Sequence, residues 1–357
     1  MNKLILISLL CLLVSCADKN EHDCQIIIFD EDKSEIQSES PQYTFIPLET
    51  RPDNLIAHIT KVEIVDNRIF TLDMRGKNVQ VFDMDGKFIA QVGAVGDAPG
   101  EYAAPHKLYI NEAAKTITII DHVKNRYMLY DLDTYQHLST REIPFYFTSY
   151  TPLSDGNHAW FYRYGYKKAR DLYYIQITDS LFHIHAYHHG IEHLSPSVIA
   201  FQELFYPYDN KIFFHYPFTP IIYEVTSDGL KAVYELSIAT KEFPSPEYLA
   251  SVTPNESADQ VMLASGYIAG YAVLETSQYI ALFYLVKKRM GIGIYNKEKQ
   301  KSYQYVDFME STLLNGVNFP FVGTYNEHFI ATISPGEMKN RRIRNDELRN
   351  LSERISE

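Results

Sequence analysis

The feature that most constrains the fold is a unit of four short strand-like segments, first complete between Lys61 and Gly93 and repeated along the chain. Its apolar runs are separated by residues that favour turns, such as Asp66-Asn67 and Asp83-Met84-Asp85-Gly86. Asp, Asn and Gly tolerate the positive φ angles that short hairpins need. Strand-length apolar runs with this punctuation predict an antiparallel meander.

The turns of this unit recur at a nearly constant interval. The turn at 131–134 follows the turn at 83–86 by 48 residues, the next begins 47 residues later at Thr178, and a fourth follows after 48 more at 226–229. A fifth turn at 296–299 comes after 70 residues, because an insertion intervenes. One meander cannot bury both of its faces, so four-stranded units with a period of about 45 residues predict the blades of a β-propeller.

The number of units predicts an all-β domain, a six-bladed β-propeller of four-stranded antiparallel blades over residues 42–336. The predicted blades cover 61–93, 106–144, 147–189, 201–238 and 266–306, with an incomplete sixth unit at 319–334. We expect an N-terminal strand, with Ile26-Ile27-Ile28-Phe29 as the candidate, to complete the sixth blade and close the ring.

Two segments depart from the strand pattern. Within the insert at 241–265, Ser245 followed by Pro246 predicts the start of a short helix, and a second helix is expected from near Asn255. The tail at 337–357 is charged and carries one apolar stripe that would suit a short helix.

The N-terminus is predicted to be a targeting signal. The apolar core from Leu4 to Val14 follows Lys3 and is too short to span a membrane, so residues 1–15 are interpreted as a signal peptide. Leu13-Val14-Ser15-Cys16 resembles a bacterial lipobox, in which Cys16 is lipidated and holds the protein on a membrane. The alternative is a plain secretory signal. With Cys16 lipidated, residues 16–41 would form an acidic tether that resembles those of surface-exported lipoproteins in the Bacteroides group.

Composition narrows the function further. The formal net charge is −12, and no basic stripe is present, which argues against nucleic acid as a partner. The 28 Tyr and 20 Phe residues suit packing between blades, and the exposed ones suit stacking on sugars. With Cys11 removed and Cys16 lipidated, Cys24 is the remaining cysteine, so no intramolecular disulfide is expected.

Several motifs resemble a known family, the six-bladed β-propeller lipoproteins of gut Bacteroides-type bacteria, which are related to NHL repeats. The resemblance is clearest over residues 43–135. It rests on the segments 45–50 (FIPLET), 68–73 (RIFTLD), 81–88 (VFDMDGKF) and 99–102 (PGEY). Residues 95–98 are poorer in glycine than the family pattern. The resemblance implies an outer-membrane lipoprotein associated with nutrient uptake, on the periplasmic or the surface side of that membrane.

The start of each innermost strand should lie at the mouth of the central channel. His58 and His106 are 48 residues apart, so we expect them at equivalent places on adjacent blades. Applying the repeat gives a ring of candidate ligand-binding residues: His58, His106, Thr148, Gln202, Gly270 and Asn318. Three interpretations are open, namely a polar ligand-binding mouth, a metal site if the two imidazoles converge, or hydrogen bonding to backbone at the blade starts.

A second histidine cluster maps to the outermost strand of blade 3 and the loop after it, and is interpreted as a solvent-exposed edge. It comprises His183, His185, His188, His189 and His193. Motifs such as HExxH, GxSxG and GxxxxGK[ST] are absent from the sequence. The carboxylates that recur once per blade, Asp73 with Asp121 and Asp83 with Asp131, indicate turn chemistry rather than acid–base catalysis.

Two functional hypotheses follow. The first is a non-enzymatic binding or scaffold lipoprotein that takes a glycan, a peptide or an envelope protein at the channel mouth, with no cofactor. The second is a propeller hydrolase or lyase with a divalent metal in the channel, held by ligands that include His58 and His106.

Overall fold

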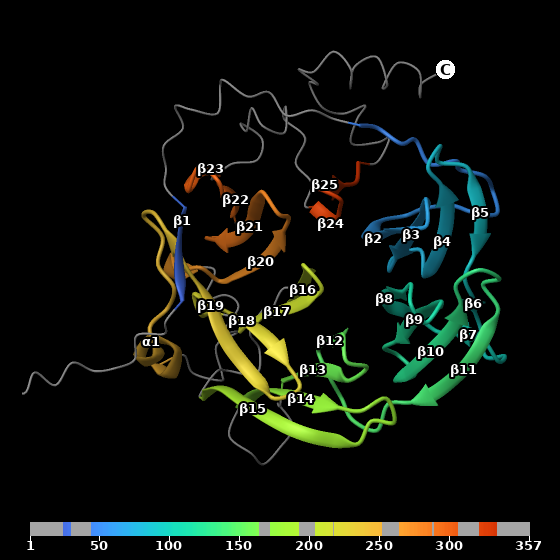
Figure 1. Ribbon diagram of the computed structural model, residues 1–357, viewed down its shortest axis with the longest axis horizontal. Helices are drawn as coiled ribbons and strands as arrows, with labels where there is room; N and C mark the ends of the chain where they lie inside the picture. The colour runs from blue at the N-terminus through green and yellow to red at the C-terminus, as the bar shows by residue number, and fades with distance from the viewer. Residues whose placement is uncertain are drawn as a thin grey trace, which may run out of the picture.

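The computed structural model describes residues 24–29, 44–163, 172–192, 204–216, 218–251, 264–287, 289–305 and 321–333, and all structural statements concern these residues. They form small twisted sheets arranged as a ring around a central axis (Figure 1). Five sheets have four or five strands, and a two-stranded hairpin lies in the sixth position. The predicted propeller architecture is therefore confirmed.

The blades follow one another along the chain, each with its first strand innermost; the fourth strand is outermost in blades 1, 2, 3 and 5. Blade 1 contains β2 (Ile59–Val65), β3 (Arg68–Asp73), β4 (Asn78–Asp83) and β5 (Phe88–Gln91). Blade 2 contains β8 (Pro105–Asn111), β9 (Thr116–Asp121), β10 (Arg126–Asp131) and β11 (His137–Glu142). Blade 3 contains β12 (Ser149–Pro152), β13 (His158–Arg163), β14 (Leu172–Thr178) and β15 (Ile184–Glu192).

The second half of the ring repeats this order. Blade 4 contains β16 (Phe205–Tyr208), β17 (Lys211–His215), β18 (Ile221–Thr226) and β19 (Gly229–Ile238). Blade 5 contains β20 (Gly270–Glu275), β21 (Tyr279–Val286), β22 (Arg289–Asn296) and β23 (Lys301–Tyr305). The sixth position holds β24 (Phe321–Tyr325) and β25 (His328–Ala331). Because β24 contacts both β2 and β20, this hairpin joins the last complete blade to the first.

The N-terminal strand does not complete the sixth blade, so that prediction is wrong. Strand β1 (Gln25–Phe29) pairs in parallel with β19, as the fifth strand of blade 4. Ile27 and Phe29 are fully buried where blade 4 meets blade 5. Gly293 of β22 makes this possible, because a Cβ at that position would lie 2.4 Å from the Phe29 ring. The apolar alternation of β1 thus fits a site between two complete blades.

Residues 44–50 cover the outer side of the seam between the sixth position and blade 1. The Glu49 N–H donates to the Gly86 carbonyl at 2.7 Å, and the Glu49 carboxylate accepts from the Phe88 N–H at 2.8 Å. Ile46 packs in a cluster that includes Ile330 of the sixth position. This segment therefore fastens the first blade to the last.

Aromatic side chains fill the space between blades, as composition predicted. Between blades 2 and 3, Trp160 is fully buried, and its ring centroid lies 4.3 Å from that of Tyr150 and 5.0 Å from that of Phe147. The Trp160 indole N–H donates to the Thr178 hydroxyl at 2.9 Å. Each blade thus contributes one wall of a shared core.

Helix α1 (Pro246–Ser251) begins where predicted. Ser245 caps it, since its hydroxyl accepts the Tyr248 N–H at 3.1 Å. The second predicted helix, the C-terminal tail at 337–357, the signal segment and Cys16 lie outside the described residues. Within the described ranges, no helix has the length and apolarity needed to cross a membrane.

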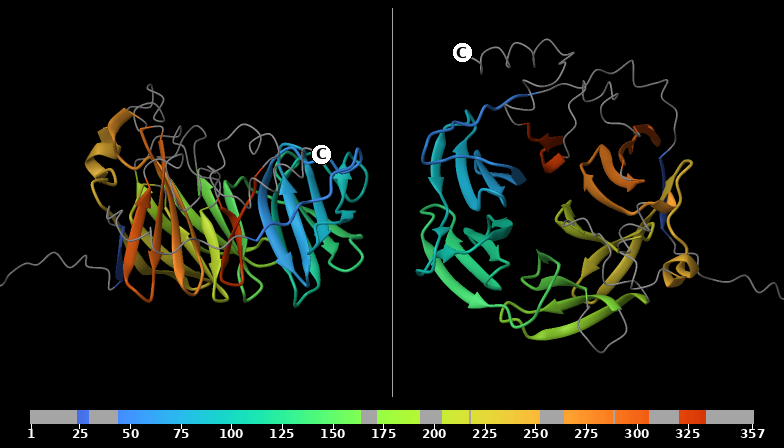
Figure 2. Two further views of the ribbon diagram at one scale, coloured as in Figure 1. Left: turned by 90° about the horizontal axis from the view of Figure 1, so that it is seen from above. Right: turned by 180° about the vertical axis from the view of Figure 1, so that it is seen from behind.

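The strands stand between two faces of the ring (Figure 2). The connection face carries the crossings between blades, such as 92–104 and 143–148, and short strands β6 (Ala94–Val95) and β7 (Glu101–Tyr102) pair in parallel within the first of these. The hairpin face carries the turns between the first and second strands, such as 66–67 and 112–115.

Candidate ligand-binding face

Two buried aspartates hold the connection face together. Asp121 accepts N–H groups from Ala103 at 2.7 Å, from Ala104 at 3.3 Å and from Val123 at 3.1 Å. In blade 1, Asp73 occupies the same place and accepts the His58 N–H at 3.0 Å. Both carboxylates are fully buried and engaged by backbone amides. As the sequence indicated, these recurring residues organise turns.

The β9–β10 turn is fastened to the loops on both sides. The Lys124 ammonium donates to the Gly96 carbonyl at 2.6 Å and pairs with the Asp97 carboxylate at 2.6 Å. The Asn125 side-chain amide donates to the Phe145 carbonyl at 3.0 Å. Asn125 itself adopts a φ of 51°, which Asn tolerates better than most residues. The turn thereby connects the crossing into blade 2 with the crossing into blade 3.

This arrangement displays rings on the connection face over blades 2 and 3. The His122 ring lies 4.9 Å from the His106 ring, at an interplanar angle of 30°, and 5.9 Å from the Phe147 ring in an edge contact. His122 is exposed, and so are Val123 of the same turn, at 69%, and Tyr146 of the 143–148 crossing, at 80%. Imidazole, apolar and phenol groups are therefore exposed on the connection face over blades 2 and 3.

His58 and His106 are not equivalent, so the predicted register between blades 1 and 2 is wrong by two residues. Ile59 pairs with Asp73, and Pro105 pairs with Asp121, so His58 matches Ala104. The β8–β9 turn has four residues (112–115), whereas the β2–β3 turn has two (66–67). The extra two residues shift the innermost strand relative to the 48-residue period of the turns.

His106 is instead the counterpart of Thr60. Each is the extra residue of a β-bulge near the start of its innermost strand, and such a bulge changes the direction of a side chain. The Thr60 hydroxyl donates to the Leu72 carbonyl at 3.1 Å. Bulges at equivalent places thus direct Thr60 and His106 away from the regular pleat.

Of the other predicted site residues, the structure describes three: His58, Thr148 and Gly270. His58 is exposed on the connection face. Thr148 directly precedes β12, and its N–H donates to the Phe161 carbonyl at 2.8 Å. Gly270 is buried at the start of β20. Gln202 and Asn318 lie outside the described residues.

The structure brings His106 together with His122, which sequence reasoning missed. The available signal was the position of His122 directly after Asp121, in the turn between β9 and β10 on the connection face. For a metal, two imidazoles are too few, and within the described ranges no three His, Cys, Asp or Glu residues gather to bind one.

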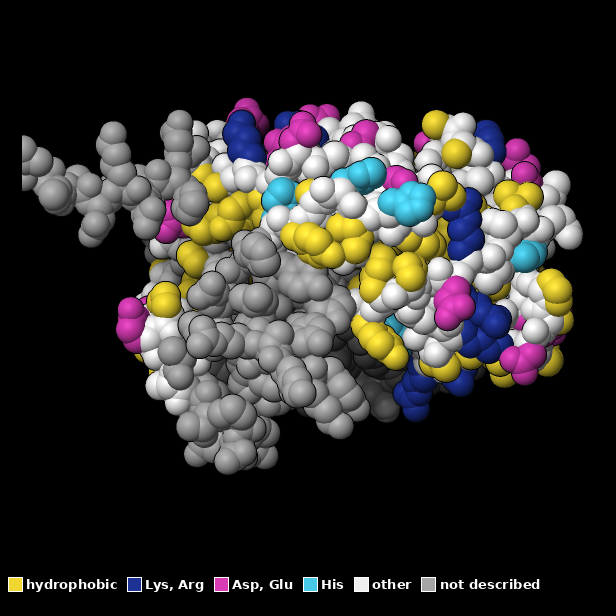
Figure 3. Space-filling view, turned by 90° about the horizontal axis from the view of Figure 1, so that it is seen from below, with side chains coloured by type: hydrophobic (Ala, Val, Ile, Leu, Met, Phe, Trp, Pro, Cys, Tyr) yellow, Lys and Arg dark blue, Asp and Glu magenta, His cyan; other side chains and the backbone are white. Residues whose placement is uncertain are grey.

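Of the second histidine cluster, His185, His188 and His189 lie on β15, the outermost strand of blade 3, as predicted, whereas His183 directly precedes that strand and His193 lies outside the described residues. His183 is exposed, and its Nδ1 lies 2.9 Å from the Asp179 carboxylate. Exposed Ile184 and Tyr187 lie on β15. Figure 3 views this rim and shows histidine and hydrophobic side chains close together on the surface.

Two further histidines are core residues. His158 is 5% exposed, its Nδ1 lies 2.8 Å from the Tyr150 hydroxyl, and burial lowers its pKa to about 4. His215 is 1% exposed and stacks on Tyr271 with ring centroids 3.9 Å apart. Neither ring nitrogen of His215 has a hydrogen-bond partner, and burial lowers its pKa to about 3. Both imidazoles are therefore neutral at pH 7.

The ring of sheets, each built from consecutive antiparallel strands, defines a β-propeller protein. Residues 15–332 match the family described as 6-bladed beta-propeller, and the chain belongs to that family. Five of the blades are complete within the described residues, and the β24–β25 hairpin occupies the sixth position. No curated protein matches the sequence.

Among solved structures, a protein of Bacteroides fragilis NCTC 9343 that is inferred to be exported has a TM-score of 0.84 and 24% identity, over 92% of this chain and 95% of that one. This similarity supports the fold. PorZ, a surface component of the Porphyromonas gingivalis type-IX secretion system, has a TM-score of 0.38 and 12% identity, over 71% of this chain and 28% of that one. Hydrazine synthase of Kuenenia stuttgartiensis has a TM-score of 0.38 and 11% identity, over 68% and 65%. The last two similarities carry no functional argument.

Proposed function

We propose that the protein is an exported binding module of the cell envelope, which takes its ligand on the connection face over blades 2 and 3. The observation that carries the proposal is the joint display of His106, His122 and exposed Tyr146 beside carboxylates that backbone amides already engage. Aromatic rings and imidazoles can bind a ligand by stacking and hydrogen bonding, without catalysing a reaction. Asp73 and Asp121 are poorly placed for acid–base work, because a base must reach the proton it abstracts.

The same groups suggest the ligand's character. A tyrosine that is 80% exposed offers a flat surface for the apolar face of a sugar or for a peptide side chain. Neutral imidazole both donates and accepts hydrogen bonds, which suits hydroxyl-rich ligands. A glycan is therefore the first ligand class to test, followed by peptides and envelope proteins.

Attachment to the envelope is the second part of the proposal. The apolar segment Leu4–Val14 and the lipobox-like Cys16 support export followed by lipid anchoring. The similar Bacteroides fragilis protein, inferred to be exported, is in keeping with this. The outer membrane is the proposed location.

The test is a glycan-array and peptide-array screen of the purified protein, repeated with the His122→Ala/Tyr146→Ala double variant. We expect a hit whose affinity falls at least tenfold in the double variant. Tyr187→Ala is the matched control, since it removes an exposed tyrosine from the outer rim of blade 3. Equal loss in both variants, or no loss in the double variant, would refute binding at this face.

The metal-dependent alternative rests on one observation, the adjacent His106 and His122 rings. Zinc needs three or four protein ligands, and these two supply only part of a set. Metal analysis of the protein beside a His106→Ala/His122→Ala variant decides the matter. Stoichiometric metal that the variant loses would favour the hydrolase or lyase.

A further inference from the structure

Two isoleucines are exposed on the outer rim of blade 4. Strand β1 is the outermost of the five strands there, and its side chains alternate between the two faces of the sheet. Ile27 and Phe29 are buried where blade 4 meets blade 5, whereas Ile26 and Ile28 are 57% and 55% exposed on the opposite face. Because natural edge strands are usually protected by charged residues, proline or a covering element, this part of the rim is suited to contact an apolar partner.

The side chains next to these isoleucines carry little charge. Residues that pair directly on adjacent strands share a face of the sheet, so Glu235 lies beside Ile26, and Ser237 lies beside Ile28. Ser237 is exposed, and Glu235 is partly exposed. One carboxylate among apolar and hydroxyl groups disfavours an anionic surface and leaves a zwitterionic one as the better match.

The proposed lipid anchor is close to these isoleucines along the chain. Cys24 directly precedes β1 and follows Cys16 by eight residues. An extended chain spans at most ~3.6 Å per residue, so the lipid-bearing residue would lie within about 29 Å of Cys24. A tether this short keeps the rim near the membrane at a high effective concentration, so a contact that is too weak to bind a free protein becomes populated.

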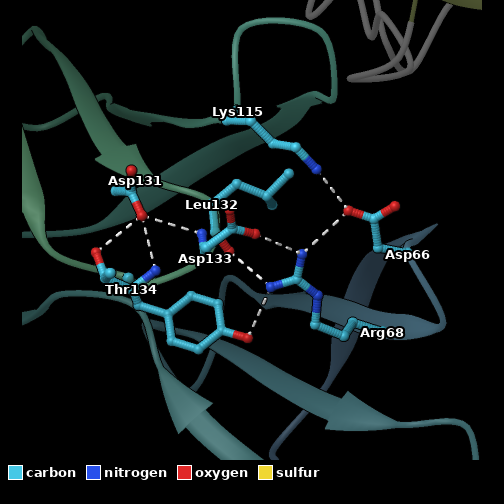
Figure 4. Close-up of polar contacts among 8 residues, drawn as sticks. Asp66, Arg68, Lys115, Asp131, Leu132, Asp133 and Thr134 are labelled. Atoms are coloured by element: carbon cyan, nitrogen blue, oxygen red, sulfur yellow. Dashed lines mark hydrogen bonds and ion pairs between the residues drawn. The ribbon is translucent and has the colours of Figure 1, made fainter.

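The two flat faces of the ring are less suited to lie on a bilayer. On the hairpin face, the Lys115 ammonium lies 2.9 Å from the Asp66 carboxylate, and the side chain of nearby Asp133 is 62% exposed (Figure 4). On the connection face, Lys124 pairs with Asp97, whose side chain is 96% exposed. Removing these charged groups from water would cost free energy, which the rim of blade 4 avoids.

We propose that Ile26 and Ile28 hold the outer rim of blade 4 against a zwitterionic phospholipid surface, so that the ring stands edge-on to the membrane. The proposal depends on the lipid anchor at Cys16 that is part of the proposed function. Blade 1 lies across the ring from blade 4, so it would be the blade farthest from the membrane (Figure 1). Both faces of the ring, including the connection face over blades 2 and 3, would stay open to solvent.

The test anchors the protein artificially and measures which part of it touches lipid. The chain without its signal segment, carrying Cys24→Ser, is coupled through the Cys16 thiol to a maleimide phospholipid in phosphatidylcholine vesicles. This coupling separates the rim contact from natural lipidation, because fractionation of the natural protein with membranes measures the natural anchor by itself.

Tryptophan reporters give the readout, because brominated phosphatidylcholine quenches tryptophans that touch its acyl chains. Ser237→Trp places a reporter beside Ile28, while Asp133→Trp on the hairpin face and Tyr146→Trp on the connection face are the matched controls. The native Trp160 is fully buried and gives the same background in each protein. We expect the Ser237→Trp reporter to be quenched about threefold more than either control.

Ile26→Asp/Ile28→Asp, combined with Ser237→Trp, should remove this excess quenching while the coupled lipid keeps the protein on the vesicles. Ile26→Thr/Ile28→Thr keeps the β-branched shape of both side chains and decides the matter if the first variant fails to fold; it should remove at least half of the excess. Equal quenching of the three reporters, strongest quenching of Tyr146→Trp, or unchanged quenching in the folded double variants would each overturn the proposal. So would a dimer in sedimentation that Ile26→Asp/Ile28→Asp dissociates, because a second copy would then cover β1.

Discussion

The guanidinium of Arg68 donates a hydrogen bond to the main-chain carbonyl of Leu132, 64 residues away, across the boundary between blades 1 and 2. The Arg68 side chain is only 15% exposed. Arg68→Ala would leave the carbonyl unpaired and should lower the free energy of unfolding by about 2 kcal/mol. Urea unfolding measures this, with Arg75→Ala, on an exposed turn, as the control. A loss no larger than that of the control would contradict the assigned role.

Asp121 should contribute more to the free energy of unfolding than the other aspartates of blade 2, because it accepts backbone N–H groups from the crossing into that blade. Asp121→Asn removes the charge from a fully buried acceptor of several N–H groups, and we expect a loss of about 2 to 3 kcal/mol in the free energy of unfolding. Asp133→Asn, whose side chain is 62% exposed, should cost less than about 1 kcal/mol. Similar losses of unfolding free energy in the two variants would contradict this role of Asp121.

The buried histidines predict acid sensitivity. A histidine whose folded pKa is depressed binds fewer protons than in the unfolded chain, so stability is full above pH 6.5 and falls as pH drops toward 4 for His158 and toward 3 for His215. In this window each one lowers the free energy of unfolding by about 1.4 kcal/mol per pH unit.

His215→Phe isolates one of these contributions. It removes two unpartnered buried nitrogens, so stability at pH 7 should change by less than about 1 kcal/mol. At pH 5 the variant should exceed the parent by about 2 kcal/mol. Chemical unfolding at both pH values gives the comparison, and exposed His185→Phe is the control. If the free energy of unfolding depended on pH in the same way in His215→Phe and in the parent, His215 would not be a source of the acid sensitivity.

Strand β1 should stabilise the fold only through its buried side chains, Ile27 and Phe29. Phe29→Ala empties a fully buried site between blades 4 and 5 and should lower the free energy of unfolding by about 3 to 5 kcal/mol. Ile28→Ala, one residue earlier and 55% exposed, should cost under about 1 kcal/mol. The two thermal unfolding midpoints provide the test, and equal shifts would mean that β1 does not pack as described.

Cys16 is predicted to carry lipid. In a host that processes bacterial lipoproteins, Cys16→Ser should shift the protein from the membrane fraction to the soluble fraction and abolish incorporation of labelled palmitate. Cys24→Ser is the matched control and should leave both readouts unchanged. Membrane retention of the Cys16→Ser protein would point to another anchor.

The propeller could be predicted because Asp83 and Asp131 each begin the turn before the fourth strand of their blade and accept backbone N–H groups there, and such turns depend on adjacent residues alone. Two features escaped prediction for physical reasons. A turn that is two residues longer moved His106 away from equivalence with His58. The proximity of His122 to His106 depends on how a turn folds over the neighbouring strand, which the repeat period does not encode.

The partner of β1 also escaped prediction, since Phe29 was expected in an unfinished blade and lies beside a complete one. An apolar strand pattern specifies burial but not the location of the burial site. The space beside Gly293 becomes visible only when blades 4 and 5 are in place.

The pairing of β1 with β19 sets an order of events during synthesis. The first strand to leave the ribosome pairs with one made after all of blades 1, 2 and 3, so it waits unpaired through more than half of the chain. Its run of three isoleucines and a phenylalanine is a segment that associates readily with other strands while exposed. This segment of the nascent chain therefore needs protection until the fourth blade provides its partner.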